Sequence, residues 1–337
     1  MGRTKVTLAE IARVAGVSRA TVSLVVRKSP LVADHTREKI ERVMSELDYV
    51  RDIGAARLRN NSSRTIGVIV PNLVNPFFTE FLSGVEQVMG EQDRVVLLAN
   101  SHDETTRQDD ILQRFRGHGV DGVILCPAEG TDPHLPERMQ KWGMPLVQSL
   151  REISAGVTDY AGGDYVEAMQ LAVSHLVAQG RRTIAFLSVS ARTSAREERV
   201  AGYVRALREN GAEGVGIVET ELTWRGAEHA AAGIMGLPRP PSAVVCFNDI
   251  LAAGLMLGLR RLGHEPGSDL AVVGLDDLPL AEFAYPSLTS VAMTPAKIGA
   301  SAARLLSRRM QQHDAPIERS ILSPTLIIRD SSTGRQA

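Results

Sequence analysis

Residues 7–25 of the chain read TLAEIARVAGVSRATVSLV, which predicts two short helices joined by a tight turn. Ala12 is small enough to let the second helix cross close by, and Gly16 allows the positive φ that the turn requires. Val22 is spaced to pack back on the first helix, and four more positions complete the apolar side, namely Ile11, Ala15, Val17 and Val25. This spacing is typical of a helix–turn–helix unit.

Local sequence specifies where the helices of this unit begin. Thr7 and Glu10 have the spacing of a capping box, in which side chains satisfy the free amides of the first turn. Ser18 is placed as the N-cap of the second helix, because a serine oxygen accepts a hydrogen bond from a first-turn amide. Residues 34–47 repeat apolar side chains at helical spacing and predict a third helix that closes a small domain.

The outward face of the second helix suits the major groove of DNA. It carries Arg19, Ala20, Thr21 and Ser23, and base edges in that groove present donors, acceptors and thymine methyl groups. Arg19 is expected to bond O6 and N7 of guanine, and Ala20 to touch a thymine methyl group. A purely structural helical hairpin has the same spacing of small and apolar residues, so the pattern alone leaves both interpretations open.

The charge distribution favours the DNA interpretation. Residues 1–64 contain 13 Lys and Arg against 7 Asp and Glu, whereas the whole chain contains 38 against 39. The first 64 residues therefore have a net charge of +6, and the other 273 have a net charge of −7. A basic head is expected of a protein that contacts DNA phosphates.

From Thr65 onward, apolar runs of strand length alternate with helical segments, which predicts βαβ units and an α/β fold. The runs are continuously apolar, as in parallel sheets covered by helices on both faces. One sheet of this width would be unusual, so we expect two doubly wound lobes of roughly 100 to 150 residues each, with a ligand cleft at the carboxyl ends of their strands. The expected strands are residues 66–70, 95–99, 122–126, 145–149, 183–188, 215–219, 243–247 and 270–274. The expected helices are residues 78–89, 104–116, 167–179, 196–210, 249–262 and 297–312.

Composition defines the remaining expectations about organisation and compartment. Cys126 and Cys246 lie in apolar runs, which predicts buried free thiols and a reducing compartment. No apolar signal segment opens the chain and no stretch reaches the roughly 20 apolar residues of a membrane span, so we expect a soluble, cytoplasmic protein without membrane association. The expected regions are a head (1–50), a basic linker (51–63), a body (64–330) and a disordered tail (331–337).

The motifs that an enzyme on this body would need do not occur in the sequence. There is no glycine-rich phosphate loop after a strand, no nucleophile elbow and no His-Glu-x-x-His motif. The eight histidines are dispersed, so metal-ligand spacing is absent and no cofactor is expected. A transport-type binding protein would share the body, but the basic head and the lack of an export signal argue against that class.

Several longer stretches carry a recognisable pattern. They are AGVSRATVS (15–23), PNLVNPFF (71–78), GVDGVIL (119–125), ERVAGY (198–203), FND (247–249) and VVGLDD (272–277). Together they resemble the lactose and galactose repressor (LacI/GalR) family of bacterial transcription regulators, over residues 6 to about 329.

The resemblance implies a homodimer whose two heads read a pseudo-palindromic operator, with a hinge helix in residues 51–63 that orders on DNA. Leu58 falls where the family inserts a leucine into the minor groove to unstack a base step. Leu24 is a departure, because many members carry arginine there, and this puts one base contact in doubt. The implied DNA-binding set is Thr7, Ser18, Arg19, Ala20, Thr21, Ser23, Leu24, Arg57 and Leu58.

The body also resembles sugar-binding proteins of the periplasmic type, which implies a small polar effector between the lobes. Carboxylate, amide and guanidinium groups bond vicinal hydroxyls, and an aromatic ring can cover an apolar sugar face. The matched positions are Asn75, Phe77, Asp103, Arg151, Arg199, Trp224, Asn248 and Asp276. Asn248 could equally cap the following helix, Phe77 could be core, and Arg199 and Asp276 could simply pair with each other.

These observations predict a sequence-specific DNA-binding regulator, most simply a repressor, whose effector is a sugar or sugar derivative. Effector binding is expected to change lobe closure and thereby the spacing of the paired hinge helices. Leu150 replaces the aspartate that members often carry before the residue matched by Arg151, which hints at an acidic or less hydroxylated ligand. A non-sugar metabolite or a protein co-regulator remains the alternative effector.

Overall fold

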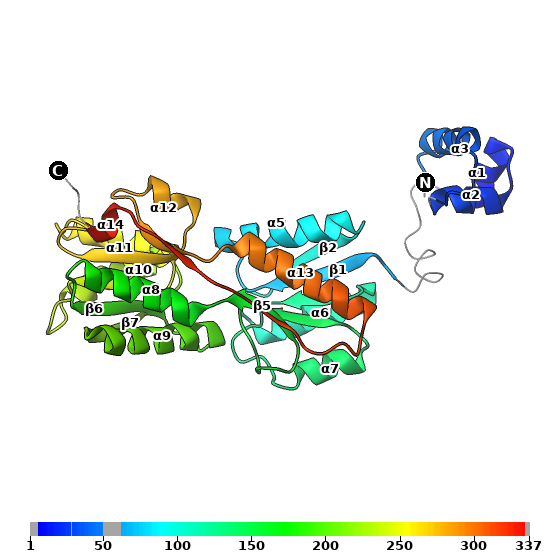
Figure 1. Ribbon diagram of the computed structural model, residues 1–337. Helices are drawn as coiled ribbons and strands as arrows, with labels where there is room; N and C mark the ends of the chain where they lie inside the picture. The colour runs from blue at the N-terminus through cyan, green and yellow to red at the C-terminus, as the bar shows by residue number, and fades with distance from the viewer. Residues whose placement is uncertain (1–5, 28, 50–61, 334–337) are drawn as a thin grey trace. The chain divides into compact units, whose positions relative to one another are not determined.

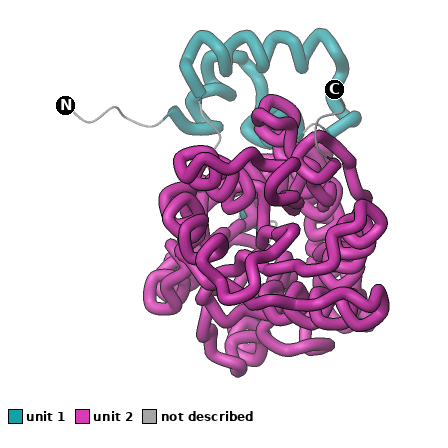
Figure 2. The backbone as a smooth tube through the Cα atoms, turned by 90° about the vertical axis from the view of Figure 1, so that its left-hand side faces the viewer, with its two compact units in different colours: residues 1–63 teal, residues 64–337 magenta. Residues whose placement is uncertain are grey.

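The computed structural model describes residues 6–27, 29–49 and 62–333, and the chain divides into two compact units between Ser63 and Arg64 (Figures 1 and 2). Most of the expected linker, including Arg57 and Leu58, lies outside the described residues. None of the helices in the described ranges is both long enough and apolar enough to cross a membrane.

The first unit contains α1 (Leu8–Ala15), α2 (Arg19–Val26) and α3 (Asp34–Glu46), as the sequence predicts. Gly16 ends α1 with φ 62°, so the expected left-handed turn is confirmed. The amide of Glu10 donates to the Thr7 hydroxyl at 3.3 Å, and the amide of Thr21 donates to the Ser18 hydroxyl at 3.0 Å. Both predicted N-caps are therefore present. The small core that joins the three helices consists of Ile11, Ala12, Ala15, Val22, Val25, Val32, Ile40 and Val43.

The N lobe of the second unit is a parallel sheet covered by helices. Its strands are β1 (Thr65–Val70), β2 (Val95–Asn100), β3 (Val123–Leu125), β4 (Leu146–Ser149), β5 (Asp159–Gly163) and β11 (Arg319–Leu322). Its helices are α5 (Pro76–Glu91), α6 (Thr105–His118), α7 (Leu135–Lys141) and α13 (Pro295–Gln311). The strand order is β11-β5-β4-β3-β1-β2. Helices α5 and α13 pack on one face of the sheet, and α6 and α7 pack on the other.

The C lobe repeats this architecture. Its strands are β6 (Thr183–Val189), β7 (Glu213–Thr220), β8 (Ala243–Cys246), β9 (Ala271–Asp276), β10 (Thr289–Ala292) and β12 (Thr325–Ile327). Its helices are α8 (Tyr165–Ala178), α9 (Ser194–Asn210), α10 (Trp224–Met235), α11 (Asp249–Arg261), α12 (Pro279–Phe283) and α14 (Asp330–Thr333). The strand order is β12-β10-β9-β8-β6-β7, and only β12 runs antiparallel to its neighbour. Helices α8 and α9 cover one face of the sheet, and α10 and α11 cover the other.

The chain crosses between the lobes three times, from β5 to α8, from β10 to α13 and from β11 to β12 (Figure 1). The two predicted α/β lobes are thus confirmed, and they are joined by three short connections. Such connections permit the lobes to rotate about a hinge while each sheet stays intact.

The sequence missed the elements that carry weak apolar signals. The eight expected strands correspond to β1–β4 and β6–β9, whereas β5, β10, β11 and β12 were not predicted, nor were α7, α10 and α12. Strand β5 reads DYAGG, and its glycines and aspartate are typical of turns rather than strands. Cys126 and Cys246 are buried free thiols, as expected.

The expectation of a disordered tail is wrong for residues 331–333. Ser331 and Ser332 lie in α14 and are buried. The Ser331 hydroxyl donates to the carbonyl of Val272 at 2.6 Å and accepts from the amide of Thr289 at 2.9 Å. A short polar segment is ordered here because buried backbone groups use its hydroxyls as hydrogen-bond partners, which composition alone does not reveal.

The crossing of α5 and α13 gives a test of the N lobe. A Cβ added at Gly84 would overlap the carbonyl oxygen of Ala296 on α13. We therefore expect Gly84→Ala to lower the free energy of unfolding by about 3 kcal/mol, because overpacking forces the helices apart. Gly117→Ala is the matched control, since a Cβ on this α6 residue meets nothing within 4 Å. It should raise the free energy of unfolding by about 0.5 to 1 kcal/mol. Urea denaturation followed by circular dichroism measures both, and equal stability of the two variants would contradict the close crossing.

Candidate functional site

The exposed face of α2 is the candidate DNA-reading surface of the first unit. Arg19 and Ala20 are exposed, and Thr21 and Ser23 are half-buried. The hydroxyls of Ser18 and Thr21 hydrogen bond to each other at 2.8 Å, so both are held at the start of the helix. The helix therefore presents the Arg19 side chain, which makes no hydrogen bond within the described unit, and beside it the small side chain of Ala20.

Two features of α2 were not evident from the sequence. Arg27, outside the predicted set, donates to the Ser23 hydroxyl at 2.8 Å, so that hydroxyl is already engaged. The spacing of four residues between them was the available signal. Leu24 packs partly against the core of the unit, which leaves less of its side chain on the open face. Thr7 serves as the exposed N-cap of α1.

A cavity of about 330 Å³ lies between the lobes of the second unit, and seven of the eight expected effector residues line it. From the N lobe these are Asn75, Phe77, Asp103 and Arg151, and from the C lobe they are Arg199, Asn248 and Asp276. Most of the lining residues follow the carboxyl ends of strands, where two open α/β sheets bind ligands. Phe78, Leu150, Leu222 and Phe247 contribute apolar walls.

Trp224 does not line this cavity, contrary to the expectation from the sequence. It is the first residue of α10 and its side chain is 48% exposed. Leu222, two residues earlier in the loop after β7, reaches the cavity instead. The helix that begins at Trp224 was not predicted, so the direction of this side chain could not be read from sequence.

The charged groups on the N-lobe side of the cavity are already paired. The Arg151 guanidinium donates to the Asp103 carboxylate at 2.6 Å and to the carbonyl of Pro127 at 3.2 Å. The same carboxylate oxygen accepts from the amide of Glu129 at 3.0 Å. Asn75 uses its side-chain oxygen to cap α5, accepting from the amide of Phe77 at 3.0 Å. On this wall the Asp103–Arg151 pair and the Asn75 side-chain oxygen are thus already engaged within the protein.

The C-lobe side is also buried, and Asn248 is engaged there as the N-cap of α11, accepting from the amide of Leu251 at 3.1 Å. Arg199 and Asp276 are the less fully paired groups of this side. The Arg199 guanidinium carbon lies 3.8 Å from the ring centroid of Tyr165 and 4.2 Å from that of Phe247. One guanidinium nitrogen donates to the carbonyl of Ala195 at 2.9 Å, but the buried Nε has no partner among the described residues. A guanidinium stacked between two rings keeps its edge available for a ligand.

Two carboxyls of the C lobe, those of Asp249 and Asp276, are buried. Burial and the charge of Asp249 raise the pKa of Asp276 well above its ordinary value, although Arg199 opposes the shift. Burial also raises the pKa of Asp249 to about 7. Asp249 accepts hydrogen bonds from the Ser290 hydroxyl at 2.5 Å and the Leu278 amide at 2.7 Å. Asp276 has no such partner in the described chain, so its carboxyl is available to a ligand.

Unusual backbone conformations gather around the cavity. His102, Asp103 and Leu150 have φ values of 55°, 61° and 65°, and Asp276 has φ 110°. Such values are costly for residues other than glycine and are found where the surrounding structure enforces them, often at ligand sites. The positive φ values were not predicted from the sequence, because none of these residues is a glycine.

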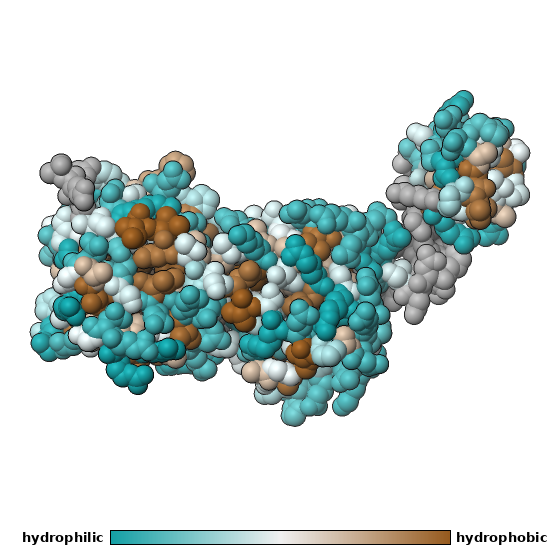
Figure 3. Space-filling view, in the orientation of Figure 1, coloured by the Kyte–Doolittle hydropathy of each residue, from teal (hydrophilic) through white to brown (hydrophobic). Residues whose placement is uncertain are grey.

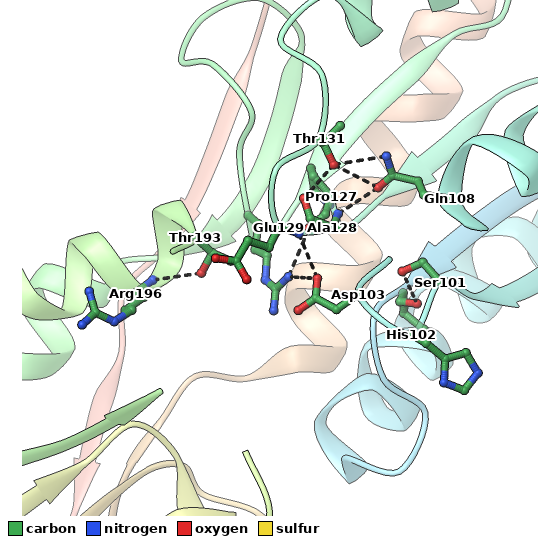
Figure 4. A network of polar contacts seen from close by, with 12 residues as sticks. Ser101, His102, Asp103, Gln108, Pro127, Ala128, Glu129, Thr131, Thr193 and Arg196 are labelled. Atoms are coloured by element: carbon green, nitrogen blue, oxygen red, sulfur yellow. Dashed lines mark hydrogen bonds and ion pairs between the residues drawn. The ribbon is translucent and has the colours of Figure 1, made fainter. Parts of the chain in front are cut away.

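Two hydrogen bonds join the lobes beside the cavity. The amide of Arg192 in the C lobe donates to the Glu129 carboxylate of the N lobe at 2.6 Å, and the amide of Glu152 donates to the Ser194 hydroxyl at 2.8 Å. Figure 4 shows Asp103, Glu129 and Thr193 in one polar network. Because Asp103 also holds the amide of Glu129, the cavity wall and the cross-lobe contact share a residue.

Comparison with known proteins gives matches to both units. Residues 7–52 match the family model of bacterial regulatory proteins, lacI family, and residues 173–332 match the periplasmic binding protein-like domain. An HTH-type transcriptional repressor PurR from Vibrio vulnificus (strain CMCP6) is 32% identical, over 96% of this chain and 98% of its own length.

Two solved structures extend the match to the arrangement of elements. The transcriptional regulator CelR in complex with cellobiose is 28% identical with a TM-score of 0.75, and the match covers 97% of this chain and all of CelR. The Lac repressor dimer bound to operator and the anti-inducer ONPF has a TM-score of 0.88 at 23% identity, covering 98% of this chain and 99% of that one. The latter likeness shows the shared fold.

The cross-lobe contact can be tested through the amide of Arg192. We expect Glu129→Ala to raise hydrogen exchange in residues 190–194 about tenfold, because the Arg192 amide loses its acceptor and the lobes lose one contact. Glu129→Gln retains an acceptor oxygen and should exchange like the unmodified chain. Hydrogen–deuterium exchange with mass spectrometry measures both, and identical exchange in Glu129→Ala and Glu129→Gln would show that this contact does not hold the lobes.

Proposed function

The chain belongs to the lacI family of bacterial regulatory proteins, and from this we propose that a small molecule in the interlobe cavity controls its binding to a specific operator. The protein is a DNA-binding repressor of that family and not an enzyme. The observation that carries the proposal is the C-lobe wall, where a buried arginine and a buried aspartate have polar atoms without partners in the described residues. The protein works in the cytoplasm, where the chromosome lies.

On the DNA side, α2 enters the major groove and Arg19 reads a guanine through two hydrogen bonds. Ala20 touches a thymine methyl group, while Thr7, Ser18, Thr21 and Ser23 contact phosphates and fix the register. Leu24 contributes little to base reading, because it packs partly against the core. Leu58, with Arg57 beside it in the hinge helix, wedges into the minor groove at the operator centre.

The effector is a carbohydrate or a close derivative. The cavity combines apolar walls, such as Phe78 and Phe247, with a guanidinium, carboxyl and amide set that matches neighbouring hydroxyls. The CelR relative is described in complex with cellobiose, which supports the same ligand class for this chain. The interlobe cavity of this chain has a volume of about 330 Å³, which admits a small ligand enclosed by both lobes.

The repressor acts as a homodimer on a pseudo-palindromic site. Strand β2 forms an edge of the N-lobe sheet, and its Val95, Leu97 and Leu98 are 60%, 36% and 44% exposed. Figure 3 shows apolar patches on an otherwise mostly hydrophilic surface. An exposed apolar edge is an association hazard that a second copy would cover.

Coupling follows from lobe closure. A ligand that contacts both lobes favours a closed state, and the linker that leaves the N lobe transmits the change to the paired hinge helices. By linkage, the effector and the operator change each other's affinity by the same factor, typically about 5- to 150-fold, which is a coupling free energy of about 1 to 3 kcal/mol.

Recognition of the DNA sequence by α2 can be tested once an operator has been selected from random DNA. We expect Arg19→Ala to cost about 1 to 3 kcal/mol and to lose discrimination at one base pair of each half-site, because that guanine loses its bidentate partner. Arg13→Ala removes an exposed cation from α1 and should weaken binding to all DNA sequences about equally. Fluorescence anisotropy with single-base operator variants measures both. A uniform loss for Arg19→Ala would assign this residue to the DNA backbone.

A further inference from the structure

Tyr165 is a buried cavity residue that the sequence did not single out. It is the first residue of α8, directly after the β5 crossing between the lobes, and its side chain is 3% exposed. Asp164 fixes the start of this helix, accepting from the amide of Glu167 at 2.8 Å. The position of Tyr165 in the cavity wall is therefore set by a capped helix terminus.

The hydroxyl of Tyr165 has no hydrogen-bond partner among the described residues, although it belongs to a buried side chain. Tyr203, buried in the same lobe, shows the usual arrangement, because its hydroxyl donates to the carbonyl of Ile184 at 2.6 Å. Burial raises the pKa of Tyr165 to about 12, so the group is neutral near pH 7 and can both donate and accept. Because Tyr165 lines the cavity, a hydroxyl that makes no hydrogen bond within the described protein is available to a ligand there.

The other unpaired groups lie beside this hydroxyl. The Arg199 guanidinium stacks on the Tyr165 ring at 3.8 Å, and the charges of Arg199 and Asp276 both act on Tyr165. Across the cavity, Asp103 and Arg151 are bonded to each other. On the C-lobe wall, the Tyr165 hydroxyl therefore lies in the same cavity lining as Arg199, whose Nε has no partner among the described residues, and Asp276.

We propose that Tyr165 is a specificity-determining residue of the effector site, with its hydroxyl bonding the effector beside Arg199 and Asp276 while its ring holds the guanidinium plane. The identity of the ligand as an effector rests on the proposed function. A matching ligand presents at least three adjacent polar groups on one side, as a run of sugar ring hydroxyls does. The opposite side of the ligand would face the N-lobe wall, where Phe78 and Leu150 lie beside the bonded Asp103–Arg151 pair.

The test compares Tyr165→Phe with Tyr203→Phe, since each variant removes a single hydroxyl from a buried ring of the C lobe. In the ligand-free protein, Tyr165→Phe should leave the melting temperature unchanged or raise it, because the hydroxyl that is removed makes no hydrogen bond with the described protein. Tyr203→Phe should lower the melting temperature, because the carbonyl of Ile184 loses its donor. A fall for Tyr165→Phe as large as that for Tyr203→Phe would overturn the inference, whatever the ligand.

The binding arm uses isothermal titration with D-glucose, D-ribose, cellobiose, gluconate and hypoxanthine as probes. For the probe that the unmodified chain binds most tightly, Tyr165→Phe should weaken binding about tenfold, the loss expected for one buried hydrogen bond. Tyr203→Phe should bind it unchanged. Undiminished binding by Tyr165→Phe would overturn the inference. Failure of the unmodified chain to bind any sugar would count against the proposed carbohydrate effector, while the melting comparison would still decide the state of Tyr165.

Discussion

A buried guanidinium without a bonded carboxylate is the feature on which the rest of this molecule depends. Arg199 is held between two aromatic rings, and Asp276, which lines the same cavity, is buried and has a raised pKa. Burying such groups unpaired is unfavourable, so a ligand that satisfies them gains what the empty protein lacks. The affinity of the cavity for a ligand is thus expected to come from the burial of these groups and not from an excess of charge on the cavity surface.

The connections between the lobes link the cavity groups to rotation of one lobe relative to the other. Three short crossings allow rotation, and the hydrogen bonds from Arg192 to Glu129 and from Glu152 to Ser194 define one relative position of the lobes. Asp103 takes part in both the cavity wall and the Glu129 contact. A ligand at the proposed site would therefore lie one residue away from a contact between the lobes, which gives the proposed coupling a physical route.

The sequence predicted the features that depend on residues close to one another along the chain. Helix caps at Thr7 and Ser18, the turn at Gly16 and eight apolar strands all follow from side-chain chemistry within a few residues. It failed where long-range contacts decide, as at α14, where hydroxyls of a polar segment satisfy buried backbone groups. Seven expected residues line the cavity, but Trp224 does not and Tyr165 was missed. Trp224 begins a helix that was not predicted, and Tyr165 lies two residues before the expected start of its helix.

We propose that occupancy of the interlobe cavity changes operator affinity. The dissociation constant of the full chain for its selected operator, measured with and without a saturating small molecule that binds the cavity, tests this coupling. We expect a change of roughly 5- to 150-fold in operator affinity, and an equal change in small-molecule affinity when operator is bound. Equal operator affinity in the presence and absence of the saturating ligand would rule the coupling out.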